Sequence, residues 1–205
     1  MFKKRIHRQV LFIALLSGLS AIPFRLSAQS YGVKGGLTMN NIMGQRNQNI
    51  RPGAQIGGFA MWGGDQVLYV KTELLLSHKG TLAWNTAAPN NVGLYYADIN
   101  VMFGIDLVQN LTLNLGFQPS LLLFGHADFS GVEGGSNEGS VTGSLTTMDY
   151  STLMGLEYFL DKNRFIGVRY NHGFVPLQGR KGTLPFGGRN PTNMTIQVYF
   201  GYRLK

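Results

Sequence analysis

A few side chains capable of acid–base or metal chemistry follow extended segments of this chain. They are three histidines, two serines and one carboxylate: Ser77, His78, His126, Asp128, Ser130 and His172. A serine, a histidine and an acid held together could cleave lipid esters, and a histidine cluster could bind a metal ion. No spacing marks a triad or a ligand set among them, and the chain has no cysteine. We therefore expect no catalytic residue, no metal and no cofactor.

A second set of polar residues is charged and alternates with apolar neighbours along the chain. Successive side chains of a strand point to opposite faces, so this alternation places the charges together on one face of a sheet. The set holds four basic and four acidic residues: Lys34, Lys71, Glu73, Asp98, Asp149, Glu157, Arg169 and Arg203.

Eight segments with this alternation must position the charged residues. They cover residues 31–39, 53–62, 68–78, 95–103, 111–118, 149–159, 166–171 and 195–204, of which the second and sixth alternate less regularly. Their connections run long, short, long, short, long, short, long. The short ones lie near 63–66, 106–110 and 160–164, and the long ones near 40–52, 79–91, 125–147 and 174–192.

This rhythm is typical of an outer-membrane barrel, in which tight turns face the periplasm and long loops face the exterior. We predict an all-β fold: an eight-stranded antiparallel up-and-down transmembrane β-barrel with short periplasmic turns and long extracellular loops.

The first 28 residues have the pattern of a secretory signal. A basic cluster precedes an apolar run at 10–22, and Leu26-Ser-Ala28 follows. The run is shorter than the roughly 20 residues of a membrane helix. We predict cleavage after Ala28, which leaves a single barrel domain over residues 29–205. The leader holds five of the 18 basic residues, so the remainder carries 13 basic and 10 acidic residues, and we expect no nucleic-acid partner.

Aromatic residues at the ends of the apolar faces favour a membrane barrel over its soluble counterpart. A lipocalin-like barrel also has eight strands, but its interior is apolar and its exterior polar, and alternation alone does not distinguish the two. Tyrosine and tryptophan favour the membrane interface. We predict a membrane girdle formed by Tyr31, Trp62, Tyr95, Phe103, Tyr150, Tyr158 and Tyr202.

The charged set then lies in the lumen. An eight-stranded barrel is only wide enough for its own side chains, and charges buried there must be paired. One interpretation is a gated ion path or proton relay; the interpretation that we favour is a structural network that fills the lumen. We expect no general diffusion pore.

The last long loop is basic and contains Arg180, Lys181 and Arg189. Arginine is suited to bidentate phosphate contact, so these residues are candidates for contact with lipopolysaccharide. A simple solvated loop is an equally good interpretation.

Five short motifs resemble one known family, and together they span most of the chain after the leader. They are Tyr31-Gly-Val-Lys-Gly-Gly-Leu37, Glu73-Leu-Leu-Leu-Ser-His-Lys-Gly80, Tyr96-Ala-Asp-Ile99, Gly155-Leu-Glu-Tyr158 and Val168-Arg-Tyr-Asn-His-Gly173. The chain is similar to the PorT-like outer-membrane β-barrel family of Bacteroidetes, although Asn100 stands where that pattern has proline. The resemblance implies a porin-like outer-membrane barrel of a Gram-negative bacterium. The family's namesake participates in type IX protein secretion.

For function, we expect a non-enzymatic structural or assembly component of the cell envelope, linked to protein secretion, with outer-membrane lipid and envelope proteins as partners. A small-solute transporter or receptor is the alternative, and a lipid-modifying enzyme is the third candidate.

Overall fold

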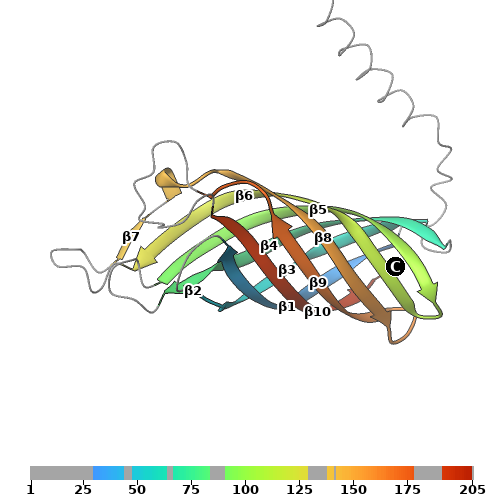
Figure 1. Ribbon diagram of the computed structural model, residues 1–205. Helices are drawn as coiled ribbons and strands as arrows, with labels where there is room; N and C mark the ends of the chain where they lie inside the picture. Colours follow the sequence, from blue (N-terminus) through green and yellow to red (C-terminus); the bar gives the residue numbers. More distant parts are fainter. Residues whose placement is uncertain are drawn as a thin grey trace, which may run out of the picture.

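The computed structural model describes residues 30–43, 48–63, 67–83, 91–128, 138–140, 142–177 and 191–204. Within these ranges lie eight long strands, which Figure 1 shows wrapped around one axis, and two short strands at one end of the barrel, β2 (Gln48–Asn49) and β7 (Glu138–Ser140). The long strands are β1 (Ser30–Met43), β3 (Arg51–Trp62), β4 (Leu68–Ala83), β5 (Asn91–Val108), β6 (Leu111–Asp128), β8 (Met148–Phe159), β9 (Arg164–Gly173) and β10 (Thr192–Arg203). No helix in the described ranges is long and apolar enough to cross a membrane.

The sheet closes on itself. Each long strand pairs antiparallel with the next one along the chain, and β1 pairs with β10, with Gly32 opposite Arg203 and Met43 opposite Thr192. Closure matters because an open edge would leave backbone groups unpaired in lipid, which costs several kcal/mol for each group. The prediction of an eight-stranded antiparallel up-and-down barrel is confirmed.

The short connections gather at one end of the barrel. They cover residues 63–67, 109–110 and 160–163, and Asn110 adopts the left-handed conformation (φ 67°) that a tight turn requires. The C-terminal end is at this same end, because the Leu204 amide donates to the Tyr31 carbonyl (2.8 Å). In outer-membrane barrels such turns face the periplasm, so the opposite end faces outward.

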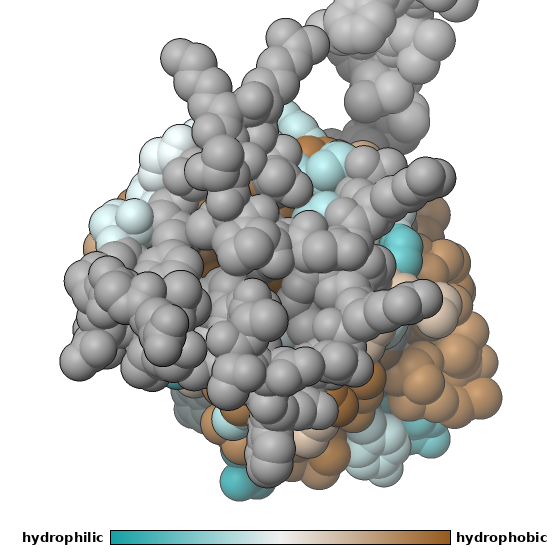
Figure 2. Space-filling model, turned by 60° about the vertical axis from the view of Figure 1, so that its left-hand side comes forward, coloured by the Kyte–Doolittle hydropathy of each residue, from teal (hydrophilic) through white to brown (hydrophobic). Residues whose placement is uncertain are grey.

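The two faces of the strands separate as the alternation predicts. Lys71, Asp98 and Arg169 are fully buried, whereas Leu37 (71%) and Ile56 (66%) are widely exposed on the outer wall. Figure 2 shows apolar residues gathered on this wall. Lipid solvates such a surface, which would be a liability for a protein in water.

Several strands run further than the sequence predicted, and one contains a bulge. β1 continues to Met43, β5 begins at Asn91 and β6 continues to Asp128. The segment predicted as a loop from residue 79 continues β4 to Ala83, so Lys79 is a buried strand residue. In β6, Tyr96 pairs with Leu122 and Tyr95 with Phe124, so the strand carries one extra residue. Such a bulge reverses the alternation beyond it, and this brings the His126 ring over Gly93.

Aromatic rings fill the periplasmic half of the lumen. The inner aromatic cluster consists of Phe59, Met61, Tyr69, Phe165 and Tyr199. Its rings lie over glycines directly opposite them on neighbouring strands: Phe59 on Gly32, Tyr69 on Gly104, Phe165 on Gly201 and Tyr199 on Gly167. A glycine opposite each ring leaves the space that the ring needs in a narrow barrel.

The outward-facing end of the lumen is filled by aliphatic side chains. The outer apolar cluster comprises Ile42, Val92, Leu94, Tyr96, Leu122, Ala127, Leu145 and Leu177. Leu145 and Leu177 come from the described parts of the connections after β6 and β9, residues 142–147 and 174–177, and both side chains are buried in this cluster.

Adding one methyl group beneath a ring tests this packing. A Cβ atom at Gly104 would lie 2.1 Å from a ring carbon of Tyr69, whereas one at Gly143 would meet nothing within 4 Å. We expect Gly104→Ala to lower the free energy of unfolding by about 1–3 kcal/mol, because overpacking displaces the ring, and Gly143→Ala to change it little. Urea titration in detergent micelles, followed by tryptophan fluorescence, measures both, and equal stabilities for the two variants would contradict the packing argument.

Candidate functional site

The centre of the lumen holds a network of ion pairs around Glu73 of β4. The Lys34 ammonium of β1 donates to both Glu73 oxygens (3.1 and 2.9 Å). The Arg169 guanidinium of β9 also donates to both, Nη1 to Oε2 at 2.6 Å and Nη2 to Oε1 at 3.1 Å. All three side chains are fully buried. Three strands that are distant in the sequence are thus joined through one carboxylate.

A second carboxylate, Glu157 of β8, completes this central network. Lys71 donates to both Glu157 oxygens (2.7 and 2.9 Å) and lies 3.4 Å from Glu73 Oε1. Arg169 Nη2 lies 3.6 Å from Glu157 Oε1. The network therefore holds three cations and two carboxylates, and its charges alone leave one positive charge in excess.

Aromatic rings stabilise the excess cation. Lys34 Nζ lies 3.5 Å from the centroid of the Tyr199 ring, and Arg169 Cζ lies 5.0 Å from it. Lys71 Nζ lies 4.3 Å from the centroid of Phe165. A desolvated cation over such a ring gains about 2 kcal/mol. The Tyr199 hydroxyl also donates to Glu157 Oε1 (2.9 Å). The Tyr199 side chain therefore contacts cations with its ring and a carboxylate with its hydroxyl.

A separate polar cluster lies nearer the outward-facing end. Lys79 of β4 donates to Asp98 of β5 (2.9 Å), and the Ser77 hydroxyl donates to the other oxygen of the same carboxylate (2.6 Å). Asp149 of β8 accepts from the Asn193 amide (2.7 Å), and no described cation lies within ion-pair distance of it. By formal charge, this outer cluster has one negative charge in excess, the opposite of the central network.

The structure brings together five of the eight predicted lumen residues in the central network. Asp98 and Asp149 belong to the outer cluster, and Arg203 lies apart from both groups. Continued alternation in β4 beyond Ser77 could have identified Lys79. Lys79 is the fourth basic residue of the two clusters, whereas the sequence analysis predicted Arg203 as the fourth. Asn100, which stands where the resembled family has proline, donates to Glu73 Oε2 (2.8 Å).

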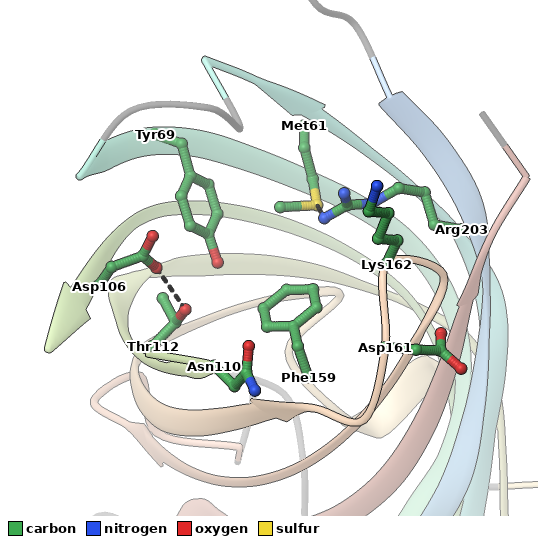
Figure 3. Close-up of a pocket in the computed structure, with 9 residues that line it drawn as sticks. All are labelled: Met61, Tyr69, Asp106, Asn110, Thr112, Phe159, Asp161, Lys162 and Arg203. Carbon is green, nitrogen blue, oxygen red and sulfur yellow. Dashed lines mark hydrogen bonds between the residues drawn. The ribbon is translucent and has the colours of Figure 1, made fainter. Parts of the chain in front are cut away.

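Arg203 lines a pocket of about 410 Å³ at the periplasmic mouth, shown in Figure 3. Its guanidinium contacts the Met61 sulfur (3.8 Å) and faces the Phe159 ring (5.4 Å). Across the pocket, the Thr112 hydroxyl donates to Asp106 (2.6 Å), as the dashed line in Figure 3 marks. Met61 and Tyr69, both members of the inner aromatic cluster, form part of the pocket wall.

The predicted girdle residues lie on the outer wall. Tyr31, Phe103, Tyr158 and Tyr202 are between 42% and 52% exposed at the periplasmic end, and Tyr95 is 42% exposed near the other end. Trp62 and Tyr150 are half-buried, and Tyr150 stacks on Phe117 with ring centroids 5.8 Å apart. Their position at a membrane interface stays a prediction.

The candidate catalytic side chains that the structure describes do not form a serine–histidine–acid group, although His78 and His126 both lie near the Tyr95 ring. Ser77 binds Asp98 inside the barrel, whereas His78 stacks on Tyr95 on the outer wall, with ring centroids 4.5 Å apart. His172 contacts the Tyr170 hydroxyl (3.1 Å). The described residues contain no group of three or more metal-binding side chains.

Several predictions concern residues outside the described ranges. They are the signal peptide at 1–28, the loop residue Ser130 and the basic loop residues Arg180, Lys181 and Arg189. These stay predictions.

A family model for the outer membrane protein beta-barrel domain matches residues 11–203. The chain belongs to this family. Its place is therefore the outer membrane of a Gram-negative bacterium, as the sequence analysis predicted.

Solved structures show the same fold for other members of the outer-membrane barrel class. Neisserial surface protein A shares 12% identity with this outer membrane protein beta-barrel domain, at a TM-score of 0.58 over 86% of this chain and 99% of the other. Ail, the attachment invasion locus protein of Yersinia pestis, shares 12% identity at a TM-score of 0.50, over 85% and 98% of the two chains. At such identities the likeness concerns the fold alone. Among curated proteins, no match to the chain was found.

Neutralising Glu73 tests the central network. Glu73→Gln leaves three buried cations with one carboxylate, and we expect it to lower the free energy of unfolding by about 3–5 kcal/mol, as when one partner of a buried ion pair is removed. Adding Lys34→Met removes one unpaired cation and should recover part of the loss. Urea titration in micelles measures these changes.

Asp161→Asn is the matched control, because Asp161 pairs with Arg164 on the surface at 2.6 Å and exposed pairs contribute little. A Glu73→Gln barrel as stable as the control would show that the network does not hold the structure together.

Proposed function

We propose that this barrel is a non-enzymatic structural or assembly component of the outer membrane. One observation carries the proposal: beyond the pocket at the periplasmic mouth, the described side chains fill the lumen up to the outward-facing end. The inner aromatic cluster occupies the periplasmic half, the central network and the outer cluster follow, and the outer apolar cluster occupies the opposite end. A lumen filled in this way does not support a continuous water-filled channel, and the function then lies at the mouths and on the outer surface of the barrel.

The same packing argues against the two alternatives from the sequence analysis. A transporter needs a path along which solutes meet polar groups in sequence, but the charges here are bonded to one another at 2.6–3.1 Å. A lipid-modifying enzyme needs a nucleophile within reach of its base, but Ser77 and His78 contact partners on opposite sides of the sheet.

The finer assignment that we propose is the PorT-like branch, with a role in protein secretion or another envelope assembly. Each of its five motifs contains at least one charged residue of the lumen: Lys34, Glu73, Asp98, Glu157 and Arg169. The motifs thus contain four of the five members of the central network, all but Lys71, which supports a shared interior design. The partners would be envelope proteins, with lipopolysaccharide contacting Arg180, Lys181 and Arg189.

Crosslinking in intact cells tests the assembly role. A tagged copy is crosslinked, extracted from the outer membrane in mild detergent and analysed by mass spectrometry, next to an unrelated tagged barrel expressed at the same level. We expect a reproducible set of envelope proteins with this barrel and not with the control. A clean monomer from the same membranes would contradict the assembly role.

Conductance measurements test the filled lumen separately. In planar bilayers, we expect the purified barrel to show no steady open channel, because moving the paired charges aside would leave them unpaired in a low-dielectric interior. A general porin in the same bilayers provides the positive control. A large, sustained conductance from the monomer would overturn the structural assignment and favour transport.

A further inference from the structure

A hollow on the outer wall, near the outward-facing end, has the shape and chemistry of a lipid site. It encloses about 630 Å³ across β1, β3, β4 and β5. Gly35, Gly36 and Ala54 lie along it, while Ile56 and Leu76 are large and widely exposed. Small residues between larger apolar ones leave a groove of the kind that a hydrocarbon chain fills.

A cationic side chain lies at the outward end of this groove. Between β3 and β4, Gln55 pairs with Ser77 and Asn49 with Leu82, so β3 has one residue more than β4 over this stretch. Such a bulge redirects the side chains within it. Arg51 lies within this stretch, between Asn49 and Gln55, and its Nη2 is 3.2 Å from Nε2 of His78, a residue that lines the groove.

The contacts of Arg51 are with neutral groups. Its Nη1 donates to the Asn91 side-chain oxygen. Because arginine only donates, His78 Nε2 must accept and the imidazole must be neutral. Among the residues whose side chains the structure describes, which leave out Asp128 opposite Asn91, no carboxylate forms an ion pair with Arg51. A half-buried guanidinium with this environment keeps its charge and has donors left over.

Three stacked or neighbouring rings lie beside this cation. His78 stacks on Tyr95, and the His126 ring is 6.2 Å from the Tyr95 ring. Histidine and tyrosine have an apolar body and a polar tip, which suits them to the boundary between hydrocarbon and headgroups. At that boundary the anions available to Arg51 are lipid phosphates, which arginine binds bidentately.

We propose that Arg51, His78, Tyr95 and the groove beside them bind a phosphate-bearing glycolipid of the outer leaflet. The phosphate accepts hydrogen bonds from Arg51, and one acyl chain lies in the groove over Gly35 and Ala54. The proposal rests on the outer-membrane location of the chain and not on an assembly role, so the crosslinking experiment and this one can fail independently.

Native mass spectrometry of the purified barrel in detergent tests the site, with diphosphoryl lipid A and its dephosphorylated form as probes. We expect wild type to prefer the diphosphoryl form by about tenfold, the effect of one hydrogen bond to a charged group. Arg51→Gln should lose this preference and Arg51→Lys should restore part of it. Arg164→Gln, which changes an exposed arginine at the opposite end, should keep it.

Three results would overturn the proposal: equal binding of the two lipids by wild type, an unchanged preference in a folded Arg51→Gln barrel, or displacement of the lipid by inorganic phosphate alone. Heat-dependent gel mobility establishes which variants are folded. If Arg51→Gln does not fold, a barrel with Arg180, Lys181 and Arg189 all changed to Gln decides the matter, because it removes the other cations that could bind the phosphate. Retained preference in that variant supports the site at Arg51, and loss of the preference overturns it.

Discussion

The interior of an eight-stranded barrel has room for side chains and little else, so every charged group inside must find its partner in another side chain. Here this constraint explains why buried charged residues occur in two paired clusters along the lumen. Glu73 receives two cations through paired hydrogen bonds at 2.6–3.1 Å, and Lys71 is shared between Glu73 and Glu157. By formal charge, the positive excess of the central network is the opposite of the negative excess of the Asp98 and Asp149 cluster. The two clusters together are formally neutral, although neither cluster is neutral by itself.

The same lack of room explains the pairing of aromatic residues with glycines. A ring as large as that of Tyr199 fits the lumen because Gly36 and Gly167 lie on either side of it, each directly opposite in the register. The ring then reaches Lys34 and Arg169, and its hydroxyl reaches Glu157. Glycine in a strand weakens it in general. In this barrel the loss is offset, because the space beside each glycine is filled by a ring that also contacts the buried charges.

Alternation was enough to predict the barrel and most of its interior, because a side chain's parity in a strand fixes the face on which it lies. It identified Lys34, Glu73 and Arg169 as lumen residues.

Alternation could not reveal which charges pair, since those contacts join strands that are distant in the sequence. It also failed where the backbone departs from regular pairing: the bulge in β6 reorients His126, and Arg51, which contacts His78, lies in a stretch with one extra residue between Asn49 and Gln55. Lys79 was missed for another reason, because the predicted strand ended at residue 78, whereas β4 continues through Gly80, with φ at 136°, to Ala83.

The lumen contacts also bear on how the closed register is specified. Sliding one strand past its neighbour by a single residue would exchange its inner and outer faces, which would place Arg169 or Glu73 in lipid. A slip by two residues would keep the faces but separate partners whose bonds span 39 to 96 positions of sequence. Because Glu73 binds residues of β1 and β9, and Glu157 of β8 binds Lys71 of β4, the contacts cross the lumen in several directions. An apolar filling of equal volume would penalise such a slip far less, since dispersion contacts have no directional requirement. The polar network is therefore suited to selecting one closure among several that the backbone alone would permit.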